Sequence, residues 1–93
     1  MNNDAAADIA VDALIFIAAD ATQLARFLDL SGLTAASIRA AAGDPGFLLG
    51  VLDYINADEA LLKAFADASG INPSVVTKAR LALGGRTWDG DVP

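Results

Sequence analysis

The side chains that most often do chemistry in proteins are scarce in this sequence. It contains no histidine and no cysteine, so the commonest general base and the thiol nucleophile are both missing. Its serines lie beside expected turns or on expected helices without a neighbouring base, and we interpret them as local hydrogen-bonding residues at helix ends: Ser31, Ser37, Ser69 and Ser74. We therefore expect no enzyme and no disulfide framework.

Carboxylates are the only plentiful ionisable groups, but their spacing matches no metal-binding loop. Asp53, Asp58 and Glu59 do not have the spacing of a calcium loop, and neither does the run Asp89-Gly90-Asp91. The glycine-containing turns lack the pattern of a phosphate-binding loop. The sequence predicts no cofactor and no metal, and three aspartates are expected to act as helix N-caps instead: Asp20, Asp44 and Asp58.

One stretch, residues 59–83, resembles the helix-turn-helix pattern of bacterial regulators. A small residue, Ala66, precedes the turn glycine Gly70 by four positions, and a branched apolar residue, Val76, follows it by six. In that motif the apolar residue anchors the second helix so that its polar face meets the major groove of DNA. The candidate DNA-contacting residues on that face are Asn72, Ser74, Thr77, Lys78 and Arg80.

The charge balance disfavours nucleic acid as a partner. The chain has 6 Lys and Arg against 12 Asp and Glu, a net charge of −6, while phosphate contacts from basic side chains dominate DNA affinity. A helix, a glycine stop and a capped helix also form a common corner in any α-bundle. We therefore predict a small acidic protein-interaction or regulatory module whose partner is another protein, with DNA binding through residues 59–83 as the alternative.

The sequence segments that would position these residues resemble two copies of one structural unit. Residues 12–42 aligned with residues 50–80, a shift of 38, give ten identities, of which only two are alanine. A repeated supersecondary unit is the expected origin of such a match. The identical pairs are Leu14/Leu52, Ile17/Ile55, Ala19/Ala57, Asp20/Asp58, Leu24/Leu62, Phe27/Phe65, Asp29/Asp67, Ser31/Ser69, Gly32/Gly70 and Ala41/Ala79.

Start and stop signals predict three helices in each copy. Caps and prolines mark the beginnings and glycines mark most of the ends. The predicted helices are about 5–18, one from 21 to the stop Gly32, one from 35 to Gly43, one that opens at Pro45 and carries Phe47 to Ile55, one from 59 to the stop Gly70, and one from Pro73 to Gly84-Gly85. The predicted fold is an all-α six-helix bundle whose halves, 5–43 and 44–84, pack about an approximate twofold axis. Gly46 and Gly50 lie one turn apart on a helix, and we favour close helix packing over a functional groove as the reason.

The remaining predictions concern the ends and the setting of the chain. Residues 1–85 are expected to form a single domain, and residues 86–93 a tail that carries the one tryptophan, Trp88. Trp88 either folds back onto apolar surface, which we favour, or acts as a protein-binding anchor. An acidic N-terminus and short uncharged stretches predict a cytoplasmic protein without a membrane segment, either a monomer or a weak dimer.

Taken whole, the sequence is similar to a family of small bacterial all-helical proteins of unknown function. The similarity spans roughly residues 9–83 and depends on helix boundaries and turns: Leu14, Ser31-Gly32-Leu33, Asp44-Pro45, Leu52-Asp53-Tyr54 and Ser69-Gly70-Ile71. What the resemblance implies is an all-helical fold and a cytoplasmic setting. It brings no activity and no functional residue with it.

Overall fold

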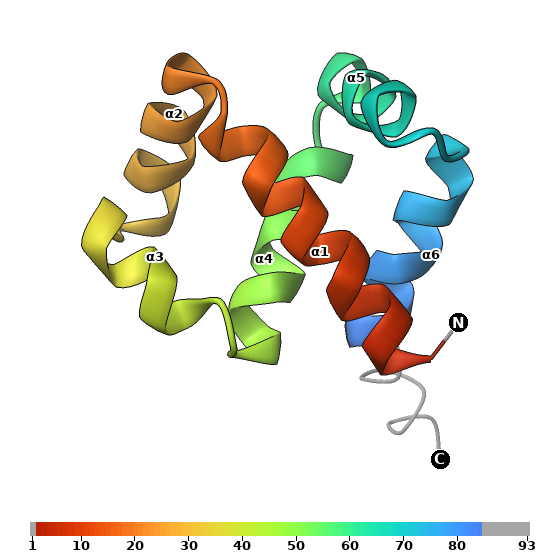
Figure 1. Cartoon of the computed structure of the whole chain (residues 1–93), viewed down its shortest axis with the longest axis horizontal. Coiled ribbons are helices and arrows are strands. Elements are labelled where there is room, and N and C mark those ends of the chain that lie inside the picture. Colours follow the sequence, from red (N-terminus) through yellow and green to blue (C-terminus); the bar gives the residue numbers. More distant parts are fainter. Residues whose placement is uncertain (1, 85–93) are drawn as a thin grey trace.

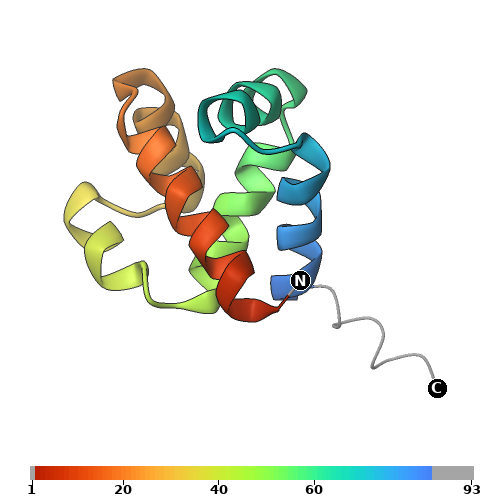
Figure 2. The ribbon, with the colours of Figure 1, turned by 45° about the vertical axis from the view of Figure 1, so that its right-hand side comes forward.

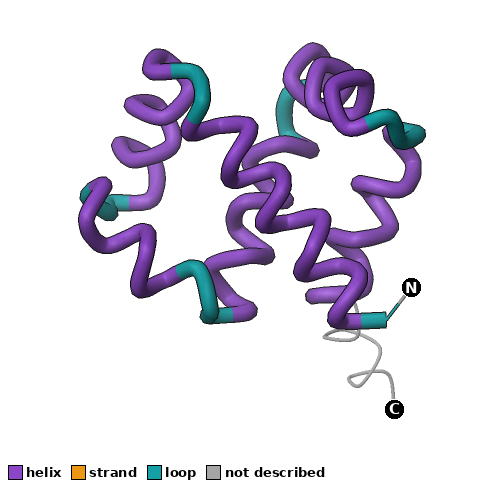
Figure 3. Tube along the Cα trace, viewed as in Figure 1, coloured by secondary structure: helices purple, strands orange, loops and turns teal. Residues whose placement is uncertain are grey.

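The computed structural model describes residues 2–84, which form six α-helices and no strand. Short loops join consecutive helices (Figure 3). The predicted all-α class is therefore confirmed for this part of the chain. The helices are α1 (Asn3–Ala18), α2 (Ala21–Ser31), α3 (Ala35–Ala41), α4 (Pro45–Asn56), α5 (Glu59–Ser69) and α6 (Pro73–Gly84).

The helix ends follow the capping signals of the sequence. Asp20, Asp44 and Asp58 each accept hydrogen bonds from backbone N–H groups in the first turn of the helix that follows. Gly32 and Gly70 end α2 and α5 with φ angles of 74° and 71°, a conformation in which a Cβ is strained. The expected start of α1 near residue 5 is wrong by two residues, because the Asn2 side chain caps the helix by accepting from the backbone N–H of Ala5.

Three helices make the centre of the molecule. α1 crosses α4, and α6 packs along both of them (Figure 1). The sides of α1 and α4 that face this contact bury aliphatic and alanine side chains, and alanine permits close approach of the helices. The largest fully buried side chains are Phe65, Ile17, Leu52, Ile55, Val51 and Val76.

Several matched positions in α1–α2 and α4–α5 share their degree of burial, whereas the matched pairs Ile38/Val76 and Ala41/Ala79 of α3 and α6 do not. Phe27 and Phe65 are both buried, and their ring partners are the matched residues Tyr54 and Phe16 of the opposite half. Centroid distances are 5.3 Å for Phe27 to Tyr54 and 5.6 Å for Phe65 to Phe16.

The third helices of the two halves are placed differently. α6 packs extensively on α1 and α4, whereas α3 packs extensively on neither and reaches the core through the half-buried Ile38. Figures 1 and 2 show α3 set apart from the two central helices in both views. α3 is also shorter, with 7 residues against 12. One side of α4 is therefore left without a covering helix.

None of the helices in residues 2–84 combines the length and apolar character that crossing a membrane requires.

Candidate functional site

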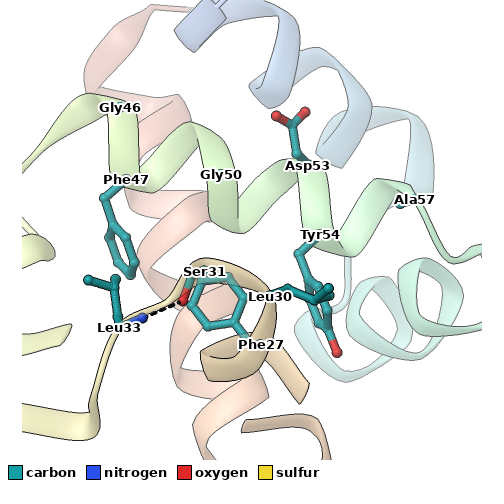
Figure 4. A pocket seen from close by; sticks show the side chains of 10 residues that line it. All are labelled: Phe27, Leu30, Ser31, Leu33, Gly46, Phe47, Gly50, Asp53, Tyr54 and Ala57. Atoms are coloured by element: carbon teal, nitrogen blue, oxygen red, sulfur yellow. Dashed lines mark hydrogen bonds between the residues drawn. The ribbon is translucent and has the colours of Figure 1, made fainter. Parts of the chain in front are cut away.

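An open apolar groove follows the uncovered side of α4. It has a volume of about 520 Å³ and lies between α4, α2 and the turn that leads to α3 (Figure 4). That size falls in the range of ligand and peptide sites on proteins. Its lining is mostly hydrophobic, aromatic or small: Phe27, Leu30, Ser31, Leu33, Gly46, Phe47, Gly50, Asp53, Tyr54 and Ala57.

Three aromatic rings form one continuous wall. The ring of Phe27 contacts those of Phe47 and Tyr54 nearly edge-on, with centroids 5.8 Å and 5.3 Å away and interplanar angles of 67° and 70°. Edge-to-face pairs of this kind are favourable beyond their buried area. The Tyr54 hydroxyl donates to Gln23 Oε1 of α2 at 2.7 Å, which fixes the ring from its polar end. The wall is thus held in place before anything binds.

Small residues make the floor. Gly46, Gly50 and Ala57 lie along one side of α4, and a Cβ added at Gly50 would meet no atom within 4 Å. The expectation that Gly46 and Gly50 serve close packing between helices is therefore wrong, because α3 does not pack on this side of α4. A glycine inside a helix costs about 1 kcal/mol relative to alanine, and among residues 2–84 no neighbouring atom occupies the space that a Cβ at Gly50 would fill.

Two leucines near the end of α2 complete the lining, Leu30 beside Tyr54 and Leu33 beside Phe47 (Figure 4). Leu30 lines the groove with 74% of its surface exposed, and Leu33 follows the glycine that ends α2. The backbone N–H of Leu33 donates to Ser31 Oγ at 3.3 Å (Figure 4), which fixes the turn. A large exposed leucine beside aromatic rings is the kind of apolar surface that marks an interaction site.

Acidic side chains outnumber basic ones around the groove, where the basic residues are Arg80, paired with Asp53, and Arg26, which lines a neighbouring hollow with Asp58 and Glu59. Asp53 lies on the rim of the groove and pairs with Arg80 of α6, yet 48% of the Asp53 side chain remains exposed. Asp44 caps α4 beside Gly46, and Asp58 and Glu59 follow Ala57 at the other end. A ligand that lay along α4 would therefore meet carboxylates at both ends of an apolar face.

A second hollow, of about 380 Å³, brings two N-cap aspartates, Asp20 and Asp58, to one place between α1, α2 and α5. Each of these carboxylates already accepts two backbone N–H groups of its own helix. No group of three acidic, histidine or cysteine side chains in residues 2–84 could hold a metal ion. This hollow offers structural caps, and we assign it no chemistry.

The five candidate DNA-contacting residues lie on α6 and its N-terminal turn, and several have partners within the chain. Asn72 accepts from the backbone N–H of Ser74, Thr77 donates to Asn56 Oδ1, and Arg80 pairs with Asp53. Lys78 is exposed. Thr77 and Arg80 thus tie α6 to α4. Trp88, the candidate protein-binding residue, lies outside the described residues.

Sequence reasoning did not identify the groove. Phe27, Phe47 and Tyr54 have the helical spacing typical of a core, and Phe27 is indeed buried while one edge of its ring lines the groove. The sequence feature that could have indicated the groove is the pair Gly46 and Gly50 on one side of a helix. From sequence alone we favour close helix packing over a groove as the reason for this pair.

A family model described as "Protein of unknown function (DUF3572)" matches residues 3–86. Curated proteins and solved structures gave no match.

Proposed function

Because the chain belongs to the DUF3572 family, whose function is unknown, we propose a role from its own surface: it is a protein-interaction module that binds an amphipathic helix of a partner in the groove between α2 and α4. The observation that carries this proposal is the open glycine floor of α4 below a fixed aromatic wall. Helices that dock in apolar grooves present anchors at i, i+3, i+4 and i+7. The groove supplies the complementary surface.

Length and shape favour a helix as the ligand. From Gly46 to Ala57 the floor follows α4 for about 16 Å, since a helix rises 1.5 Å per residue. That length corresponds to about three turns of a partner helix lying alongside. Glycine and alanine in the floor let the backbones approach closely, so that the partner's apolar side chains reach the wall formed by Phe47 and Tyr54.

The charges specify the partner further. Carboxylates at both ends of the groove and a net charge of −6 favour a helix whose apolar face is flanked by lysine or arginine. The rim charges would speed association, and the apolar contacts would supply most of the affinity. The groove itself exists because the two halves, which we take to be copies of one three-helix unit, differ in the packing of their third helix.

We do not extend this proposal to DNA. Arg80 is engaged with Asp53, and only six basic side chains are available in the whole chain to neutralise phosphates.

A synthetic peptide tests the proposal. The probe is a fluorescently labelled helical 12-mer with leucine at positions 1, 4, 5, 8 and 11 and lysine at most other positions, and binding is followed by fluorescence anisotropy. Leu30→Asp should weaken binding by about tenfold or more, as expected for an interface anchor. Leu81→Asp is the matched control, because Leu81 is 51% exposed on α6, outside the groove, and the substitution adds the same charge.

Two results would refute the groove as the binding site. One is an equal change in binding by Leu30→Asp and Leu81→Asp, which would show that Leu30 is not an anchor, since an added negative charge by itself should strengthen binding of a lysine-rich peptide equally at both positions. The other is equal binding of a peptide with the same composition but scrambled leucine spacing. Circular dichroism of both variants should match that of the original protein, since both leucines are largely exposed.

A further inference from the structure

The end of α6 delivers the C-terminal segment to the side of α4. Gly84, the last described residue, lies so close to Leu49 of α4 that an added Cβ would be 2.7 Å from Leu49 Cδ2. Leu49 is adjacent in sequence to Gly50, which lines the groove about 100° further around the same helix. Gly84, where the described part of the chain ends, therefore lies within one helix width of the groove.

The distance to the groove is within reach of a short stretch of chain. Trp88 is the fourth residue after Gly84, and four extended residues span about 13 to 14 Å. A helix with its side chains is about 10 to 12 Å across. A segment of that length is thus long enough to pass around α4 from Leu49 to the groove.

The chemistry of this segment suits the groove. Trp88 is its one aromatic residue, and an indole ring can pack edge-to-face against Phe47 and Tyr54 as those rings pack on Phe27. Arg86 comes two residues earlier in the sequence, and the rim of the groove carries Asp53, whose carboxylate pairs with Arg80 while 48% of its side chain remains exposed.

We propose that residues 85–93 fold back over α4 and place Trp88 in the groove between α2 and α4, where it is an intramolecular competitor of the partner helix. The competition, though not the docking of Trp88, rests on the function proposed above. A partner then binds only the fraction of molecules in which the tail has left the groove, so the tail lowers the apparent affinity by that fraction. If the tail is docked nine-tenths of the time, affinity falls about tenfold.

Intrinsic fluorescence of the full chain tests the docking directly, because Trp88 is the only tryptophan. We expect blue-shifted emission that is protected from acrylamide. Leu30→Asp and Gly50→Gln should each shift the emission to the red and increase quenching. Leu81→Asp and Gly43→Gln are the matched controls and should change neither, because both positions lie outside the groove and Gly43 has equally open space around it. Red emission in the original protein, or emission that all four variants leave unchanged, would overturn the inference.

Peptide binding to Trp88→Ala separates this inference from the proposed function. If both hold, Trp88→Ala binds the 12-mer more tightly than the original chain, by about tenfold for a tail docked nine-tenths of the time. Protected Trp88 emission with no peptide binding to either protein would leave the docked tail in place and refute the proposed function. Exposed Trp88 emission, together with equally tight peptide binding by the original protein and by Trp88→Ala, would refute the docked tail and leave the proposed function in place.

Discussion

The ring of Phe27 on α2 lies nearly edge-on to the ring of Tyr54 on α4, with their centroids 5.3 Å apart. Phe27 is 4% exposed, so this contact belongs to the core and to the groove at once. Truncation of Phe27 to alanine should lower the free energy of unfolding by about 3 to 5 kcal/mol, which is typical of a buried phenylalanine. Urea denaturation measures the loss.

Phe65→Ala should cost a similar amount, since Phe65 is 1% exposed and contacts Phe16. A loss below about 1 kcal/mol at either site would contradict this packing.

The Tyr54 hydroxyl gives a milder test of the same wall. Tyr54→Phe removes the hydrogen bond to Gln23 Oε1 and keeps the ring, so unfolding free energy should fall by about 0.5 to 1.5 kcal/mol. Peptide affinity should fall with it, because the ring is no longer fixed from its polar end. Gln23→Ala is the matched variant and should have no further effect on stability when combined with Tyr54→Phe. Additive losses in the double variant would show that the two side chains act independently.

Glycines at helix ends and in the groove should respond to alanine in opposite directions. Gly32 and Gly70 have positive φ, so alanine at either should destabilise the protein by about 1 kcal/mol or more. Gly50 lies inside α4 with open space around it, so Gly50→Ala should stabilise by about 1 kcal/mol while it raises the floor of the groove. Thermal unfolding compares the three variants. A destabilising Gly50→Ala would indicate that another group packs against that position.

The helix ends could be predicted because they depend on neighbouring residues alone. Asp20 and Gly32 signal the start and stop of α2 through local hydrogen bonds and backbone conformation, and the same logic holds for Asp58 and Gly70 of α5. No distant contact is needed to read these signals. The six helices were therefore accessible from sequence.

The groove could not be predicted because it depends on where α3 packs. An apolar residue such as Phe47 has the same helical spacing whether its outer side is covered by another helix or open. That choice depends on tertiary packing and not on local signals, and the short α3 decides it because α3 does not pack extensively on α4. A glycine at position 50 is compatible with both arrangements, close packing of a neighbouring helix and an open floor of a groove.

DNA binding through α6 is expected to be absent. We predict that the protein does not retard double-stranded DNA at low salt in gel-shift experiments, because Arg80 pairs with Asp53 and the net charge is −6. If retardation is seen, the double substitution Lys78→Ala with Arg80→Ala decides its origin. Loss of binding in that variant, but not after Arg39→Ala with Lys63→Ala on α3 and α5, would support the helix-turn-helix alternative. Each lost phosphate contact should then lower the salt slope by about one.

α3 should be the least stable of the helices in residues 2–84. α3 contacts the core through the half-buried Ile38 and does not pack extensively on α1 or α4, whereas α6 packs along both. Backbone amides that are protected only by local contacts open more often than core amides. Hydrogen exchange should therefore be at least about tenfold faster in α3 than in α6. Ile38→Ala should increase hydrogen exchange in α3 and leave exchange in α6 unchanged, because α6 is held in the core by Val76 and Ala79. Equal protection of the two helices would mean that α3 is anchored as firmly as α6, and the open side of α4 would then need another explanation.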